Sequence, residues 1–184
     1  MKVYIALLRG INVGGKTSLP MKDLVSILED LGARNVRTYI QSGNAVFVSP
    51  EKDPLRLSNK TSREIKKRSG FEPHVLLLEA NDLETTMRRN PFPDAVSNPS
   101  TLHAGFLASV PEKPNLKAIE NLKSNTERFQ LIDKVFYLHA PDGIGRSKLA
   151  ANVEQLLGVP MTDRNWRTVC KIREMVQDVK KSGP

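Results

Sequence analysis

The stretch that decides the fold is residues 35–48, NVRTYIQSGNAVFV. Two runs rich in β-branched and aromatic residues, Asn35–Ile40 and Ala45–Val48, flank the tetrapeptide Gln41-Ser42-Gly43-Asn44. Glycine and asparagine tolerate the positive φ angles that tight β-turns require, so this composition is typical of a hairpin. The stretch therefore predicts two antiparallel strands joined by a turn at Ser42-Gly43-Asn44.

The segments around this hairpin alternate between strand and helix patterns. A short apolar run, Val3–Leu8, predicts a buried strand, and Pro20 then begins a helix with apolar residues at helical spacing up to Gly32. A basic helix is expected at 54–70 and a strand at Val75–Leu78. The resulting order, βαββαβ, is the split βαβ arrangement of ferredoxin-like domains.

The second half of the chain repeats most of this order. The expected elements are a strand at Leu102–Ala108, a helix at Asn115–Leu122, a second hairpin from Arg128–Ile132 and Val135–His139, a helix carrying Leu149, Val153 and Leu156, and a last helix that follows Asp163. This pattern is βαββα, and the Pro-rich segment 91–100 is interpreted as a linker. We expect an α+β fold with two ferredoxin-like (α–β plait) subdomains, residues 1–92 and 93–184.

A glycine-rich loop lies between the first strand and the first helix. Residues 10–17 match the phosphate-binding pattern G-x-x-x-x-G-K-[ST], in which Lys16 would reach a phosphate and Thr17 would hold magnesium. Two features oppose a nucleotide site. Pro20 disfavours a helical conformation at the residue before it, and such sites need parallel strands, whereas the hairpin makes its strands antiparallel. We therefore expect a strand-to-helix loop whose glycines serve backbone geometry and whose surface can still attract an anion.

Four motifs, in order along the chain, carry a resemblance to a known family. They are Arg9–Gly15 (RGINVGG), Tyr39–Asn44 (YIQSGN), Gly145–Leu149 (GRSKL) and Arg164–Thr168 (RNWRT). With these motifs, the chain resembles the bacterial family known as domain of unknown function 1697 over essentially its whole length. The resemblance implies a two-part α+β structure with ferredoxin-like halves and no established reaction. The family usually has asparagine at the position of Thr17, so the match to the nucleotide pattern looks accidental.

The two C-terminal motifs put cations at predicted helix N-termini, where they oppose the positive end of the helix dipole. Arg146 and Lys148 lie in the first turn of one helix, and Arg164 and Arg167 lie at the start of another. A bound phosphate or carboxylate would reverse this unfavourable arrangement. The alternative is structural: Asp163 would cap the last helix and pair with an arginine.

Polar loop residues of the first half complete the candidate site. We expect the glycine-rich loop and the hairpin turn to lie at or near opposite ends of their shared strands, so they need not form one site. Turn chemistry alone is the alternative explanation for Ser42-Gly43-Asn44. The candidate ligand-binding residues are Arg9, Asn12, Lys16, Ser42, Asn44, Arg146, Ser147, Lys148, Arg164, Asn165, Arg167 and Thr168.

Composition permits several functions. The net charge of +8 and the sequence pI near 9.7 suit anionic partners, either small molecules or nucleic acid. Aromatic residues make up only 5% of the chain, which weakens an RNA-recognition interpretation, and the basic helix around residues 59–68 is most simply a solvated face. The leading hypothesis is binding of a phosphate- or carboxylate-bearing ligand. The alternatives are an enzyme acting on phosphorylated or nucleic-acid substrates and non-specific nucleic-acid binding.

Other classes of function find no support in the sequence. One cysteine, Cys170, and three widely spaced histidines predict neither an intrachain disulfide nor a metal site. No apolar run is long enough to cross a bilayer, and the first residues make a poor signal peptide, so we expect a cytoplasmic protein without membrane contact. The sequence indicates no particular cofactor, catalytic residue or oligomeric state.

Overall fold

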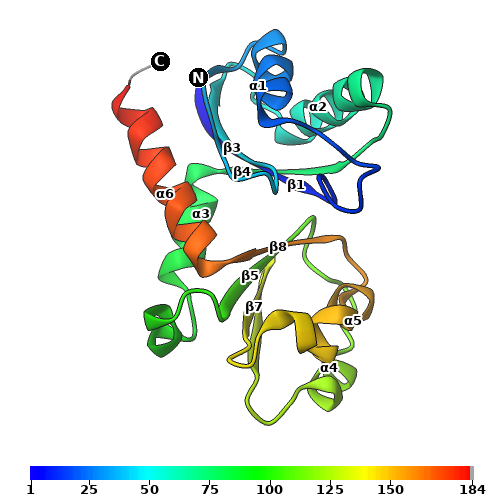
Figure 1. Ribbon diagram of the computed structural model, residues 1–184. Coiled ribbons are helices and arrows are strands. Elements are labelled where there is room, and N and C mark those ends of the chain that lie inside the picture. Colours follow the sequence, from blue (N-terminus) through cyan, green and yellow to red (C-terminus); the bar gives the residue numbers. More distant parts are fainter. Residues whose placement is uncertain (183–184) are drawn as a thin grey trace. The chain divides into compact units, whose positions relative to one another are not determined.

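The computed structural model describes residues 1–182, which form two compact units (Figure 1). The first unit consists of Met1–Thr85 together with the C-terminal segment from Cys170, and the second consists of Thr86–Val169. The end of the last helix therefore joins the first unit, whereas the predicted division kept all of residues 93–184 together. Apolar side chains at the end of this helix, among them Val176 and Val179, are buried.

The first unit contains a four-stranded antiparallel sheet with the order β2-β3-β1-β4. Its elements are β1 (Lys2–Arg9), α1 (Met21–Asp30), β2 (Arg34–Tyr39), β3 (Asn44–Ser49), α2 (Pro54–Ser69), β4 (His74–Glu79) and the beginning of α3 (Ala80–Arg88). The predicted hairpin is confirmed, because β2 and β3 pair antiparallel and Tyr39 lies opposite Asn44. Helices α1 and α2 cover one face of this sheet (Figure 1).

The core of the first unit lies between these two helices and the sheet. Alternate residues of β1, including Tyr4 and Leu8, point to the helix-covered face and pack with apolar residues of α1 and α2 such as Leu24 and Ile65. The helix ends follow local chemistry: the Asp53 side chain caps the N-terminus of α2, and residue 70 ends it in the left-handed conformation.

The second unit contains another four-stranded antiparallel sheet, with the order β6-β7-β5-β8. Its elements are the end of α3, the short helix η1 (Pro93–Ser97), β5 (Leu102–Leu107), α4 (Leu116–Leu122), β6 (Arg128–Ile132), β7 (Val135–His139), η2 (Ile144–Arg146), α5 (Lys148–Leu157), β8 (Met161–Asn165) and the first residues of α6 (Trp166–Lys181). Helices α4 and α5 cover one face of this sheet (Figure 1). The protein is thus a mixed α+β protein with two four-stranded antiparallel sheets.

Strand β8 was not predicted. The sequence pattern ended the second half at βαββα, but Met161–Asn165 pairs antiparallel with β5 and completes the order βαββαβ. The strand is short and carries Asp163 and Arg164, so it has no run of apolar residues that would indicate a strand. Pairing with β5, which is distant in sequence, sets its conformation.

The segment interpreted as a linker is packed within the second unit. Phe92 is 8% exposed, and the guanidinium of Arg128 lies 4.8 Å from the centre of its ring. Arg128 also forms an ion pair of 2.6 Å with Asp94 in η1. The prolines shape a short turn of helix here, and the side chains around them hold it in place.

Candidate anion-binding site

The glycine-rich loop and the hairpin turn meet at one end of the first sheet, so the expectation of opposite ends is wrong. Because β1 and β3 are antiparallel, the end of β1 lies beside the start of β3, with Leu7 opposite Asn44. The side-chain amide of Asn12 donates to the backbone carbonyls of Gln41, at 2.7 Å, and Leu19, at 3.0 Å. The backbone N–H of Leu19 donates in return to Asn12 Oδ1 at 2.8 Å. Asn12 therefore ties the loop to the turn, and these polar atoms serve the fold.

The candidate residues of the turn also make structural contacts. Asn44 is fully buried, and its side-chain amide donates to the backbone carbonyl of Tyr39 at 3.1 Å and to Ser42 Oγ at 3.0 Å. Gly43 has a φ of 79°, and a Cβ there would lie 2.6 Å from the Cβ of Leu8. The turn therefore requires these residue types for backbone conformation and close packing.

The remaining candidates of the first unit do not build a nucleotide loop. The Thr17 hydroxyl donates to the backbone carbonyl of Val13 at 3.1 Å and accepts the backbone N–H of Val13 at 3.5 Å, so it is part of the loop's own turn. The helix begins only at Met21, so no helix N-terminus follows Lys16 directly. The side chain of Lys16 is exposed and has no ion pair within residues 1–182. Arg9 is exposed at the end of β1, opposite His74.

In the second unit, the GRSKL motif lines a pocket of about 510 Å³. Three segments build it: the end of α4 with the turn that follows, the loop after β7, and the start of α5. The lining residues are Asn121, Leu122, Ser124, Glu127, Ala140, Asp142, Gly143, Arg146, Ser147 and Lys148. Ser147 is the N-cap of α5, since its hydroxyl accepts the backbone N–H of Ala150 at 2.9 Å.

The two cations beside this cap have no carboxylate partner. Arg146 and Lys148 are exposed and form no ion pair with any residue that the structure describes. Two carboxylates line the same pocket but are engaged elsewhere: Asp142 accepts the hydroxyl of Thr126 at 2.6 Å, and Glu127 accepts the backbone N–H of Ser124 at 2.9 Å. The pocket therefore combines two unpaired cations beside a helix N-terminus with two carboxylates, whose neutral hydrogen-bond donors leave their negative charge in place.

The RNWRT motif lies at the junction of β8 and α6, which differs from the prediction. Arg164 is on the strand, and the last helix is capped by Asn165, whose Oδ1 accepts the backbone N–H of Thr168 at 3.0 Å. Loss of contact with water lowers the pKa of the Arg164 guanidinium to about 10, partly offset by the neighbouring Asp163 carboxylate. Only Arg167 presents an exposed cation here.

Asp163 has a different role from the predicted cap, and this role brings in His103, which was not among the candidates. Asp163 Oδ2 lies 2.8 Å from Nδ1 of the buried His103. The predicted cap position is thus part of a strand, and its carboxylate orients an imidazole on β5. No local spacing in the sequence reveals this pair, since 60 residues separate the two.

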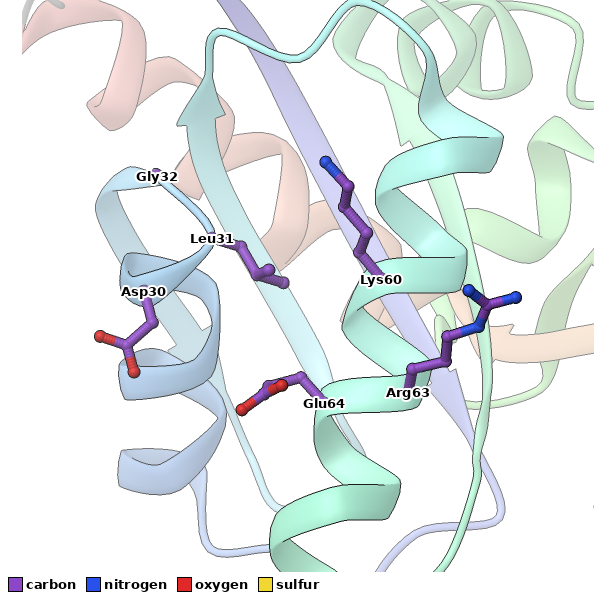
Figure 2. A pocket seen from close by; sticks show the side chains of 6 residues that line it. All are labelled: Asp30, Leu31, Gly32, Lys60, Arg63 and Glu64. Atoms are coloured by element: carbon purple, nitrogen blue, oxygen red, sulfur yellow. The ribbon is translucent and has the colours of Figure 1, made fainter.

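Cations of the basic helix α2 form ion pairs with nearby carboxylates. Its Arg68 pairs with Asp30 at 2.7 Å and with Glu64 at 3.0 Å, while Lys66 pairs with Glu72 at 2.8 Å. An open hollow of about 600 Å³ lies between the end of α1 and this helix. Figure 2 shows Glu64 pointing from α2 towards α1, whereas Arg63 points away. The hollow is lined by two cations, Lys60 and Arg63, and by two carboxylates, Asp30 and Glu64, both of which pair with Arg68.

The candidate residues thus fall into three groups. Arg9, Asn12, Lys16, Ser42 and Asn44 gather at one end of the first sheet, Arg146, Ser147 and Lys148 gather at the pocket, and Arg164, Asn165, Arg167 and Thr168 lie where β8 becomes α6. No three His, Cys, Asp or Glu side chains among residues 1–182 lie together as a metal ion would require. No helix in this part of the chain has the length and apolar character needed to cross a membrane.

Comparisons with known proteins agree with the α+β class and define a family. The family model described as protein of unknown function (DUF1697) matches residues 1–137, so the chain belongs to this family and the predicted resemblance is confirmed. The chain is also similar to the solved structure of the conserved bacterial protein SP0830 from Streptococcus pneumoniae. The two are 28% identical with a TM-score of 0.67, over 95% of this chain and 98% of that one. Functionally curated proteins give no match.

Proposed function

We propose that this protein binds a small anionic ligand, carrying a phosphate or a carboxylate, in the pocket at the N-terminus of α5. The observation that carries the proposal is the pair Arg146 and Lys148, two cations that line one pocket, flank the helix cap and have no ion pair within the described chain. Cations in this position are unfavourable by about 0.3–1 kcal/mol each when exposed. An anion between them would turn that cost into attraction.

The first helical N–H groups add to the support. The hydroxyl of Ser147 satisfies the backbone N–H of Ala150, whereas the N–H groups of Lys148 and Leu149 have no partner within the helix. Backbone donors, a hydroxyl and two cations together match the donors that bind phosphate in proteins. The candidates of the first unit play no part in this proposal. The side chains of Asn12, Ser42 and Asn44 already bond within the glycine-rich loop and the hairpin turn, and Arg9 and Lys16 do not line the pocket.

The test is a titration with inorganic phosphate, followed through the backbone amide signals of Gly143 and Ala150 by NMR. In the wild type we expect saturable shifts, and the double variant Arg146→Ala/Lys148→Ala should weaken binding at least about tenfold, as the loss of charged hydrogen bonds implies. Lys113→Ala/Lys117→Ala is the matched control, because it removes two exposed lysines of the same unit outside the pocket. Equal affinity in the two double variants would refute the site.

The two alternative functions make different predictions. An enzyme that acts on phosphorylated substrates should lose turnover in Lys16→Ala. Non-specific binding of nucleic acid should weaken steeply with added salt, because phosphate contacts release counterions. The ion pairs of α2 reduce the positive charge that this helix offers to a nucleic-acid backbone. We therefore rank both alternatives below the small-anion proposal.

We propose that both units are ferredoxin-like, and the matching strand orders β2-β3-β1-β4 and β6-β7-β5-β8 support this, since each follows the split βαβ order. We propose a bacterial origin, which the similarity to a streptococcal protein supports. Cytoplasmic residence stays a prediction from the sequence.

A further inference from the structure

The pocket at α5 is lined by carboxylates as well as by cations. Glu127 is only 6% exposed, and Asp142 lies nearby on the loop after β7. Both line the same cavity as Arg146 and Lys148, so two carboxylates and two cations face one space. This balance of charge is a property of the pocket that simple anion binding does not use.

Glu127 is the more informative of the two carboxylates. Its Oε2 accepts the backbone N–H of Ser124 at 2.9 Å, and its Oε1 has no hydrogen-bond partner in residues 1–182. No cation within the described chain pairs with it either. Among the described residues, Oε1 is not one of the buried polar atoms that lack a partner, so solvent reaches this oxygen and a ligand in the pocket can reach it too.

The opposite charges of the pocket do not satisfy one another. Neither Arg146 nor Lys148 forms an ion pair with Glu127 or Asp142. A ligand with only negative charge would satisfy the cations and be repelled by the carboxylates. A ligand with both charges would pair with the cations and with the carboxylates at once.

We propose that the ligand is a zwitterion of the α-amino acid class. This inference rests on the proposed function, since it assigns the anionic group of the ligand to the same cations. The α-carboxylate binds Arg146 and Lys148 beside the cap of α5. The ammonium group donates to the unpartnered Oε1 of Glu127, with Asp142 adding attraction from the loop. The volume of about 510 Å³ leaves room for a polar side chain.

A matched pair of probes tests the proposal. L-Glutamine and 4-carbamoylbutanoate share a carbon skeleton and a carboxylate and differ in the α-ammonium group. We expect the wild type to bind glutamine at least about tenfold more tightly, as a charge-assisted hydrogen bond implies. Glu127→Gln should abolish that preference, and it keeps an oxygen that can accept the N–H of Ser124, so the turn is preserved. Amide NMR spectra of each variant verify folding, and Asp142→Asn serves as the second variant.

The outcomes separate this inference from the proposed function. A glutamine preference that disappears in Glu127→Gln supports the zwitterion. Equal binding of both probes, or binding of phosphate alone, overturns the zwitterion and leaves the anion proposal intact. A glutamine preference unchanged in both Glu127→Gln and Asp142→Asn also overturns it. Failure of all three probes to shift the amides of the pocket overturns both proposals.

Discussion

The two units share one strand order but differ at the N-terminus of their second helix. In the first unit a connection of four residues, 50–53, leads from β3 to α2, and its own carboxylates occupy the helix N-terminus. Asp53 Oδ1 accepts the backbone N–H groups of Leu55 at 2.9 Å and Arg56 at 3.2 Å. Glu51 adds contacts of 3.5 Å to Arg56 and 3.6 Å to Lys60.

The corresponding connection of the second unit, residues 140–147, is longer and ends in a neutral cap. Ser147 takes the position of Asp53, and the cations Arg146 and Lys148 flank it without carboxylate partners in the described residues. At the same topological position, cations are therefore paired with carboxylates in the first unit and unpaired within the described residues in the second. One strand order therefore carries different charge arrangements at equivalent connections, so the strand order by itself does not specify a site.

The units differ equally in the turns of their hairpins. Each turn receives a backbone hydrogen bond of 2.8 Å from the end of the first strand: Leu8 donates to the carbonyl of Gly43, and Leu107 donates to the carbonyl of Lys134. In the first unit the turn packs tightly under the glycine-rich loop. In the second the same position is an exposed lysine.

The largest effect we expect comes from Gly43→Ala. The new Cβ would lie 2.6 Å from the Cβ of Leu8 and 2.7 Å from Cδ1 of Ile11, at a φ of 79°. Overpacking and backbone strain together should lower the free energy of unfolding by about 3 kcal/mol. Urea denaturation measures this value. Lys134→Ala is the control at the equivalent position and should stay within about 0.5 kcal/mol; equal losses would mean that the two turns are equally packed.

The next effect should come from Ser147→Asp, which gives α5 the kind of cap that α2 has. Asp and Ser are comparable N-caps, so the free energy of unfolding should change by less than about 1 kcal/mol. The added carboxylate would occupy the anion position, and phosphate affinity should fall at least about tenfold. Phosphate titration by NMR measures the affinity. Undiminished binding would show that the phosphate lies away from the cap.

The smallest effect that we expect is on the pH dependence of the free energy of unfolding. The backbone N–H of Asp53, followed by the Arg56 guanidinium, lowers the pKa of Glu51 below its ordinary value of 4.5 in the folded state. The stability that the Glu51 carboxylate contributes to the folded state is therefore complete above about pH 4.5 and is lost as the pH falls through the lowered pKa. Urea denaturation at pH 7 and pH 3 measures the free energy of unfolding. We expect this free energy to fall less between the two pH values in Glu51→Gln than in the wild type. The control is Glu112→Gln, at an exposed position of the other unit, and its free energy of unfolding should fall as much as that of the wild type.

Part of the site could be read from the sequence and part could not. The GRSKL motif indicated the N-terminus of a helix with cations beside it, because caps and helix starts depend on neighbouring residues. The sequence did not indicate Glu127 as a pocket residue, because it reaches the pocket from a turn 19 residues before Arg146 and no local pattern links the two. Asp163, which the structural alternative made a helix cap, lies on a polar strand, and the pairing of β8 with β5 turns its carboxylate to His103.

By itself, the sequence determined the hairpin at residues 35–48, and with it an antiparallel sheet that rules against a nucleotide loop. Turn chemistry acts over three or four residues, so local composition is enough to specify it. The tertiary structure alone decided that Asn12 bonds to the hairpin turn, that β8 completes the second sheet, and that three separate segments enclose a pocket of mixed charge. These contacts join residues far apart in the chain, and long-range packing, which no local pattern encodes, determines them.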